Sequence, residues 1–128
     1  MYSPTTVDHF MHPRNVGRLP HASGTGRARS RSCDDRLEIT VEWVDGVLRC
    51  AFRAQGCSAC IAAASVLTEM VNNAPHSEEA ARAIDRDVLA AALDSVPADK
   101  LRCVALAPVA LGRALDDAQR QRPGEAPG

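Results

Sequence analysis

The chain has 128 residues, a formal net charge of −1 and five cysteines. This length suits one domain with a hydrophobic core of its own. The balanced charge argues against a general nucleic-acid-binding protein, because such domains are usually basic. No stretch reaches the roughly 18 apolar residues of a membrane span, so no membrane partner is expected. The arginine-rich run RARSRSCDDR (27–36) is a local basic patch, which is usually a solvated face.

The N-terminal stretch MYSPTTVDHF has neither the basic segment nor the apolar segment of a secretory signal. We therefore expect a cytoplasmic protein, in which thiols stay reduced. In that compartment, five cysteines indicate metal binding or thiol chemistry rather than a disulfide framework. Residues 1–24 are expected to form a short segment with turns, including one helical turn at 8–11 before Pro13.

Two stretches with a two-residue period predict a hairpin. Residues 37–43 (LEITVEW) alternate between apolar and polar side chains, and 47–54 (VLRCAFRA) alternate again. Asp45-Gly46 between them is a strong hairpin signal. One face of this hairpin should be buried and the other wet, with Cys50 on the buried face as a core residue. Residues 25–31 alternate weakly and are expected to form an edge strand.

The period changes to that of a helix after Gly56. Ser58 is the expected N-cap of a helix that ends near Asn72–Pro75. Ser77 and Asp85 should cap two further helices, and a last helix carries Leu106, Ala110, Leu111, Ala114 and Leu115. Pro108 fits near the start of that helix, because a proline in a helix interior costs about 3 kcal/mol.

Strands followed by helices predict an α+β domain, in which a small antiparallel sheet of about three strands packs against several C-terminal helices. Residues 1–118 are expected to form this single domain. Residues 119–128 have no apolar period and are expected to be a disordered tail.

Three cysteines fall at the ends of predicted elements, where functional sites usually form. Cys33 precedes the first clear strand by a few residues, Cys57 lies at a strand-to-helix junction, and Cys103 lies just before the last helix. Helix N-termini lower the pKa of a thiol, and thiolates are the ligands that zinc and iron–sulfur clusters prefer. Asp35 would add a hard oxygen ligand that exchanges easily, which suits temporary holding of metal or sulfide. Three unrelated thiols remain an alternative, because the chain has no pair of CxxC motifs.

Cys57 and Cys60 raise a second alternative, a thioredoxin-type redox pair at the start of a helix. The predicted order of a hairpin and then helices lacks the βαβ unit of that fold, and aromatic residues are only 3% of the chain. We therefore expect Cys60 to be a core or spare thiol.

Four motifs together carry a family resemblance. They are YSPTTVDHFMHPRNVGRL, Cys33-Asp34-Asp35, GCSACIAAASVLTE and DKLRCVALAPVAL. Their counterparts are Y-S…V-x-D-H-x…P-R-N-V-G, C-G-D, G-C-x-x-x-I-A-x-S-S…T-E and K-x-x-C…L-A…A-L. The chain thus resembles the U-type iron–sulfur cluster assembly scaffolds (IscU, the N-terminal domain of NifU, and SufU) from Tyr2 to about Leu115.

The resemblance implies the IscU/NifU-N-like fold and a carrier rather than an enzyme. It implies that Cys33, Asp35, Cys57 and Cys103 hold a transient [2Fe–2S] cluster built from iron, with Asp35 favouring cluster release. Cys103 would be the first acceptor of sulfur from a cysteine desulfurase, and apo iron–sulfur proteins would receive the cluster. Zinc often occupies this site in isolated scaffolds. Use of a chaperone and assembly as a homodimer are left open.

The chain departs from the family pattern at three places. Asp34 replaces the glycine of C-G-D, Arg102 replaces the histidine before the third cysteine of IscU, and Val96–Lys100 replaces the chaperone-recognition stretch L-P-P-V-K. A basic residue at 102 resembles the SufU branch, so a zinc-bound sulfur acceptor is an alternative function. A structural zinc domain is a further alternative.

Overall fold

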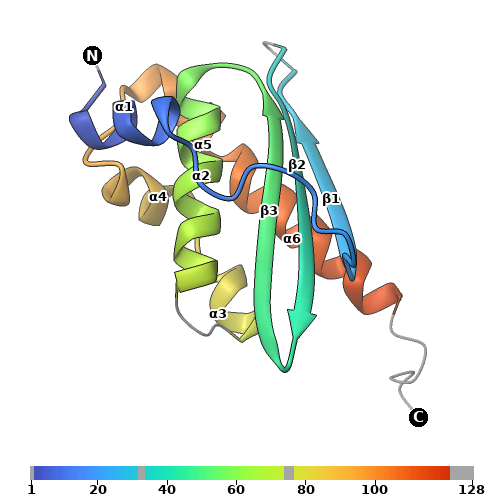
Figure 1. Ribbon diagram of the computed structural model, residues 1–128. Coiled ribbons are helices and arrows are strands. Elements are labelled where there is room, and N and C mark those ends of the chain that lie inside the picture. Colours follow the sequence, from blue (N-terminus) through green and yellow to red (C-terminus); the bar gives the residue numbers. More distant parts are fainter. Residues whose placement is uncertain (1, 32–33, 74–76, 122–128) are drawn as a thin grey trace.

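The computed structural model describes residues 2–31, 34–73 and 77–121, and it has the predicted α+β architecture (Figure 1). The strands β1 (Gly24–Arg29), β2 (Arg36–Val44) and β3 (Val47–Gln55) form an antiparallel sheet in the order β1-β2-β3. The helices are α1 (Pro4–Met11), α2 (Ser58–Asn73), α3 (Glu78–Arg82), α4 (Arg86–Ala92), η1 (Ala98–Lys100), α5 (Leu101–Val104) and α6 (Leu106–Arg120). No helix in these ranges is long and apolar enough to cross a membrane.

The hairpin of β2 and β3 forms as predicted. Asp45 and Gly46 both have positive φ, at 52° and 79°, which is the geometry of a tight hairpin turn. Ile39 pairs with Phe52 in the register of the two strands, and both side chains are buried. This face of the sheet packs against α2 and α6, and the core lies between the sheet and these two helices (Figure 1).

The other face of the sheet is less exposed than the alternation predicts. The segment between α1 and β1 crosses this face (Figure 1), and Gly17 N donates a hydrogen bond of 2.7 Å to the Phe52 carbonyl at the edge of β3. Thr40, which we expected on the wet face, is 1% exposed, and its hydroxyl oxygen accepts a 3.1 Å hydrogen bond from Leu19 N. The N-terminal segment therefore covers part of the outer face and the free edge of β3, which limits edge-to-edge association.

Most helix starts follow the predicted caps. Ser77 and Asp85 cap α3 and α4 through side-chain oxygens that accept from the backbone three residues on. α1 begins four residues before the expected helical turn, because Ser3 caps it and Pro4 fits the first turn. α2 begins one residue earlier than expected, because Ser58 is its first residue and not its N-cap. The Cys57 carbonyl, not that of Ser58, accepts the first helical hydrogen bond, from Ile61 N at 3.2 Å.

The last helix also extends beyond the prediction. α6 runs to Arg120, two residues past the expected end of the domain at 118, and Pro108 lies in its first turn as expected. The chain reaches α6 through η1 and α5, two short elements that the sequence pattern did not predict. Residues 122–128 of the expected tail lie outside the described residues.

A buried histidine joins α1 to α2. His9 is 5% exposed, and its Nδ1 and the Ser65 hydroxyl oxygen share a hydrogen bond of 2.8 Å, while the same oxygen accepts a hydrogen bond from Arg14 N. Burial lowers the pKa of His9, and the Arg14 guanidinium lowers it further, whereas Glu69 and Asp8 act in the opposite direction. The neutral imidazole is therefore the form that fits the fold.

Acidification from pH 7 to pH 5 is expected to destabilise the fold through His9. The unfolded chain protonates this residue near pH 6.5, while the folded chain resists protonation, so the free energy of unfolding falls as pH falls through this window. Urea midpoints at pH 7, 6 and 5 measure the slope. His9→Gln should flatten it, and an unchanged slope in that variant would assign the pH dependence to other groups.

Candidate metal centre

Three of the four expected ligands converge at one end of the sheet. One ligand atom from each of Asp35, Cys57 and Cys103 lies within 4.8 Å of the others. Asp35 immediately precedes β2, Cys57 is the N-cap of α2, and Cys103 lies in α5, which packs against α2. This convergence is the arrangement that the positions at the element ends predict. Cys33 lies outside the described residues, so its place as a ligand stays a prediction.

Asp35 is held against the start of α2 by two contacts with Cys57. The Cys57 backbone N–H donates to Asp35 Oδ1 at 2.9 Å, and the Cys57 thiol donates to Oδ2 at 3.3 Å. Gly56 makes this approach feasible, because a Cβ at that position would lie 2.4 Å from Asp35 Oδ1. Asp35 is 3% exposed, and the hydrogen bond from the Cys57 backbone N–H fixes the orientation of its carboxylate before any ligand arrives.

The donor set fits a transition metal. A metal about 2.3 Å from each thiolate sulfur spans at most about 4.6 Å between two ligands, so the observed spacing needs only a small adjustment. Two sulfurs and one carboxylate oxygen suit iron or zinc rather than magnesium or calcium. Cys103 and Asp35 are buried, whereas Cys57 is partly exposed, which leaves the centre accessible from the side of Cys57.

The thiol of Cys103 does not have the lowered pKa that its position before a helix predicts. Its side chain is 3% exposed, and burial raises its pKa. Hydrogen bonds with Cys57 and Asp35, and the negative charges of those groups, raise it further. A cation bound among these residues would favour the thiolate by charge neutralisation, so metal binding should release protons and weaken at low pH.

Two neighbours of the centre were not singled out by sequence analysis. Tyr2 lies close enough to Cys57 and Cys103 for their charges to add to burial in raising its phenol pKa, while Lys100 lowers it. Tyr2 precedes α1 in the chain, so only the folded arrangement of α1 against α2 brings it to the centre. The close-approach role of Gly56 was missed for the same reason, although its position before Cys57 in a family motif was a signal.

The other described cysteines belong to the core, as expected. Cys60 is 0% exposed, which disfavours an accessible Cys57–Cys60 redox pair. Cys50 is 1% exposed, and burial raises the pKa of its thiol to about 12.

Cys50 is therefore expected to resist alkylation in the folded protein. At pH 8, iodoacetamide should label the partly exposed Cys57 and leave Cys50 unmodified, because almost none of the buried thiol is ionised. In 8 M urea both should react, which peptide mass spectrometry reports. Labelling of native Cys50 as fast as Cys57 would contradict this interpretation.

The two residues near the centre that depart from the family pattern, Asp34 and Arg102, both have exposed side chains. Asp34 is exposed and is not part of the three-residue ligand group. Arg102 is exposed and forms no ion pair with any described residue. Neither side chain therefore replaces a ligand in this arrangement.

Comparison with known proteins identifies the family. The family model described as the NifU-like N terminal domain matches residues 1–124. The chain belongs to this family of U-type scaffolds. It is 39% identical over 118 residues to the iron–sulfur cluster assembly scaffold protein IscU 1 of Archaeoglobus fulgidus, covering 91% of this chain and 76% of the relative. It is 33% identical over 126 residues to the scaffold protein IscU of Rickettsia prowazekii, covering 94% of each.

Solved structures show the same fold at low sequence identity. A putative SufU scaffold from Fervidobacterium islandicum AW-1 has a TM-score of 0.72 and 17% identity, covering 89% of this chain and 96% of its own. The N-terminal part of a NifU-like protein from Brucella abortus has a TM-score of 0.70 and 16% identity, and the match covers 97% of this chain and 95% of that protein's chain. These likenesses confirm the IscU/NifU-N-like fold expected from the sequence.

Proposed function

We propose that this chain is an iron–sulfur cluster assembly scaffold, on which a [2Fe–2S] cluster is built from iron and sulfur and then passed to apo acceptor proteins. The observation that carries the proposal is the convergence of Asp35, Cys57 and Cys103 within 4.8 Å. The names of the IscU relatives support the same role. Cys33, two residues before Asp35, is the proposed fourth ligand.

Sulfur enters, in this proposal, through Cys103. Its thiolate attacks the outer sulfur of a persulfide on a cysteine desulfurase, forming a sulfur–sulfur bond on Cys103 while the desulfurase thiolate leaves. The Cys103 thiol must first lose its proton, and the raised pKa means that free Cys103 is mostly protonated near neutral pH. Iron at the centre would lower that cost, which couples sulfur uptake to iron binding. A separate reductant supplies the two electrons that convert each transferred sulfur to sulfide.

Asp35 is the ligand of the proposed site that should exchange most easily. Carboxylate oxygen is a harder ligand than thiolate sulfur, and Asp35 already has an alternative partner in the Cys57 N–H. Release of the cluster therefore leaves the carboxylate hydrogen-bonded rather than unpaired. A reducing cytoplasm is the compartment in which these thiols would remain available.

Anaerobic reconstitution tests the proposed function. The chain is incubated with ferrous iron, cysteine, a reductant and a cysteine desulfurase, and then mixed with an apo ferredoxin. The proposal predicts visible absorption of a [2Fe–2S] cluster on the chain, followed by its appearance on the ferredoxin. Sulfide held only in solution, with no cluster on the chain, would contradict it.

A zinc-bound sulfur acceptor is the second candidate function. The three-donor group fits one tetrahedral zinc ion with a fourth ligand as well as it fits a cluster. This candidate predicts one tightly held zinc, a persulfide on Cys103 and no cluster chromophore under the same conditions.

A further inference from the structure

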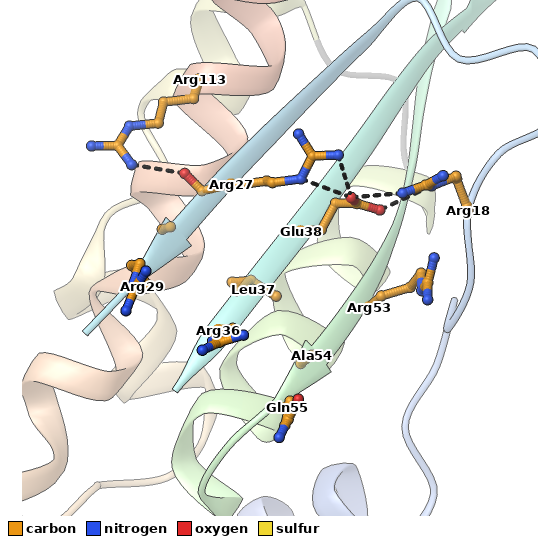
Figure 2. Close-up of a pocket in the computed structure, with 11 residues that line it drawn as sticks. Arg18, Arg27, Arg29, Arg36, Leu37, Glu38, Arg53, Ala54, Gln55 and Arg113 are labelled. Atoms are coloured by element: carbon orange, nitrogen blue, oxygen red, sulfur yellow. Dashed lines mark hydrogen bonds and ion pairs between the residues drawn. The ribbon is translucent and has the colours of Figure 1, made fainter. Parts of the chain in front are cut away.

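The outer face of the sheet carries a groove of about 720 Å³ that is rich in arginine (Figure 2). We call it the arginine groove. β1, β2 and β3 each contribute to it, the N-terminal segment contributes Arg18, and α6 contributes Arg113. Its charged lining residues are Arg18, Arg27, Arg29, Arg36, Arg53, Arg113 and Glu38. Six arginines and one carboxylate in one groove form a strong local excess of positive charge on a chain whose net charge is −1.

The strand register arranges the groove in two cross-strand rows. In the first row, Glu38 of β2 pairs with Arg27 of β1 and with Arg53 of β3. Glu38 also forms ion pairs with Arg27 at 2.9 Å and with Arg18 at 2.8 Å, which Figure 2 shows as dashed lines. This row therefore contains a carboxylate that is already engaged by two guanidinium groups.

The second row contains no carboxylate. Arg36 of β2 lies directly opposite Arg29 of β1 and Gln55 of β3. Like charges in directly opposed positions destabilise a sheet. Arg29, Arg36 and Arg53 are exposed and form no ion pair with any residue in the described ranges. An anionic occupant would offset this repulsion.

The second row also adjoins the metal centre. Arg36 directly follows Asp35, and Gln55 is two residues before Cys57. The groove thus begins beside the proposed cluster ligands and extends away from them along the outer face. A molecule held in the groove would lie next to the centre.

We propose that the arginine groove docks a partner protein through a strip of carboxylates on that partner's surface. The planar guanidinium group of arginine forms bidentate hydrogen bonds with a carboxylate. Discrete carboxylates can be placed to avoid Glu38, whereas the continuous phosphate line of a nucleic acid would meet its negative charge. The net charge of −1 also lacks the overall basic excess that is typical of a nucleic-acid-binding domain. Delivery of sulfur or receipt of a cluster by the docked protein rests on the proposed function, but the docking itself does not.

Fluorescence anisotropy with a labelled octaglutamate peptide tests the docking on the metal-free chain. Arg29→Gln/Arg36→Gln is the test variant. Arg49→Gln/Arg86→Gln is the matched control, because it removes the same charge from two exposed arginines outside the groove. Arg49 lies on the same face of β3 as Arg53, which lines the groove. Binding at low salt should weaken about three- to thirtyfold in the test variant and at most about twofold in the control.

Three results would overturn the proposal: no binding by the wild type, equal weakening in both variants, or tighter binding of a thymidine oligonucleotide with eight phosphates than of the peptide. The last result would assign the groove to nucleic acid. The thermal midpoint of Arg29→Gln/Arg36→Gln should equal or exceed that of the wild type, because the opposed charges are gone. Failure of the wild type to load a cluster, with peptide binding intact, would count against the proposed function alone.

Discussion

Gly26→Ala is expected to lower the free energy of unfolding by about 2–3 kcal/mol, which is the upper end of the usual cost of overpacking. A Cβ at this position would lie 2.1 Å from the Ala110 carbonyl oxygen and 2.3 Å from Ala114 N. Both are backbone atoms of α6, so no side-chain rotation can relieve the overlap. The helix would have to move away from β1, which would open the core between α6 and the sheet.

Gly112→Ala is the matched control for that variant. Gly112 lies within α6 itself, and a Cβ there would meet nothing within 4 Å. Alanine is better than glycine in a helix by about 1 kcal/mol, so this substitution should stabilise the chain. Urea unfolding with an unchanged slope gives both values. A Gly26→Ala midpoint equal to the wild type would contradict the close packing of α6 on β1.

Gly56→Ala is expected to weaken metal binding about 10- to 100-fold, as loss of an outer-shell contact commonly does. The added Cβ would lie 2.4 Å from Asp35 Oδ1 and 3.0 Å from Asp35 Cα. The carboxylate would be displaced and lose its two contacts with Cys57. Backbone as well as side chain must move, so the change acts on the position of the ligand rather than on its chemistry.

Zinc titration in competition with a chromophoric chelator measures this effect. Gly112→Ala again serves as the control, because it also adds one methyl group but lies away from the centre. Circular dichroism confirms that Gly56→Ala is folded. Equal zinc affinity in the wild type and Gly56→Ala would show that the position of Asp35 does not matter for metal binding.

Local patterns predicted the elements that depend on local physics. The alternation around Asp45-Gly46 predicted the hairpin, and Ser77 and Asp85 predicted two helix starts, because turns and caps are determined by neighbouring residues. The burial of Thr40 could not be predicted in this way. It depends on the Leu19 N–H, which the crossing N-terminal segment brings from 21 positions away in the chain.

Only part of the candidate site could be predicted from the sequence, for the same reason. The positions of Cys57 and Cys103 at element ends predicted that they would meet Asp35, and they do. The raised pKa of Cys103 was missed, because it results from burial and from charges that arrive from two other elements. The positive charge of the run 27–36 was visible in the sequence, but the opposition of Arg29 and Arg36 required the strand register.

Anaerobic cluster reconstitution on single cysteine variants, followed by visible absorption, tests the proposed ligand set. Cys33→Ser, Cys57→Ser and Cys103→Ser remove proposed ligands, whereas Cys60→Ser changes a fully buried cysteine three residues from Cys57 and is the matched control. If these three cysteines hold the cluster, the visible chromophore is lost in the three ligand variants and retained in Cys60→Ser. A chromophore that survives in Cys57→Ser and Cys103→Ser would show that these two cysteines are not cluster ligands.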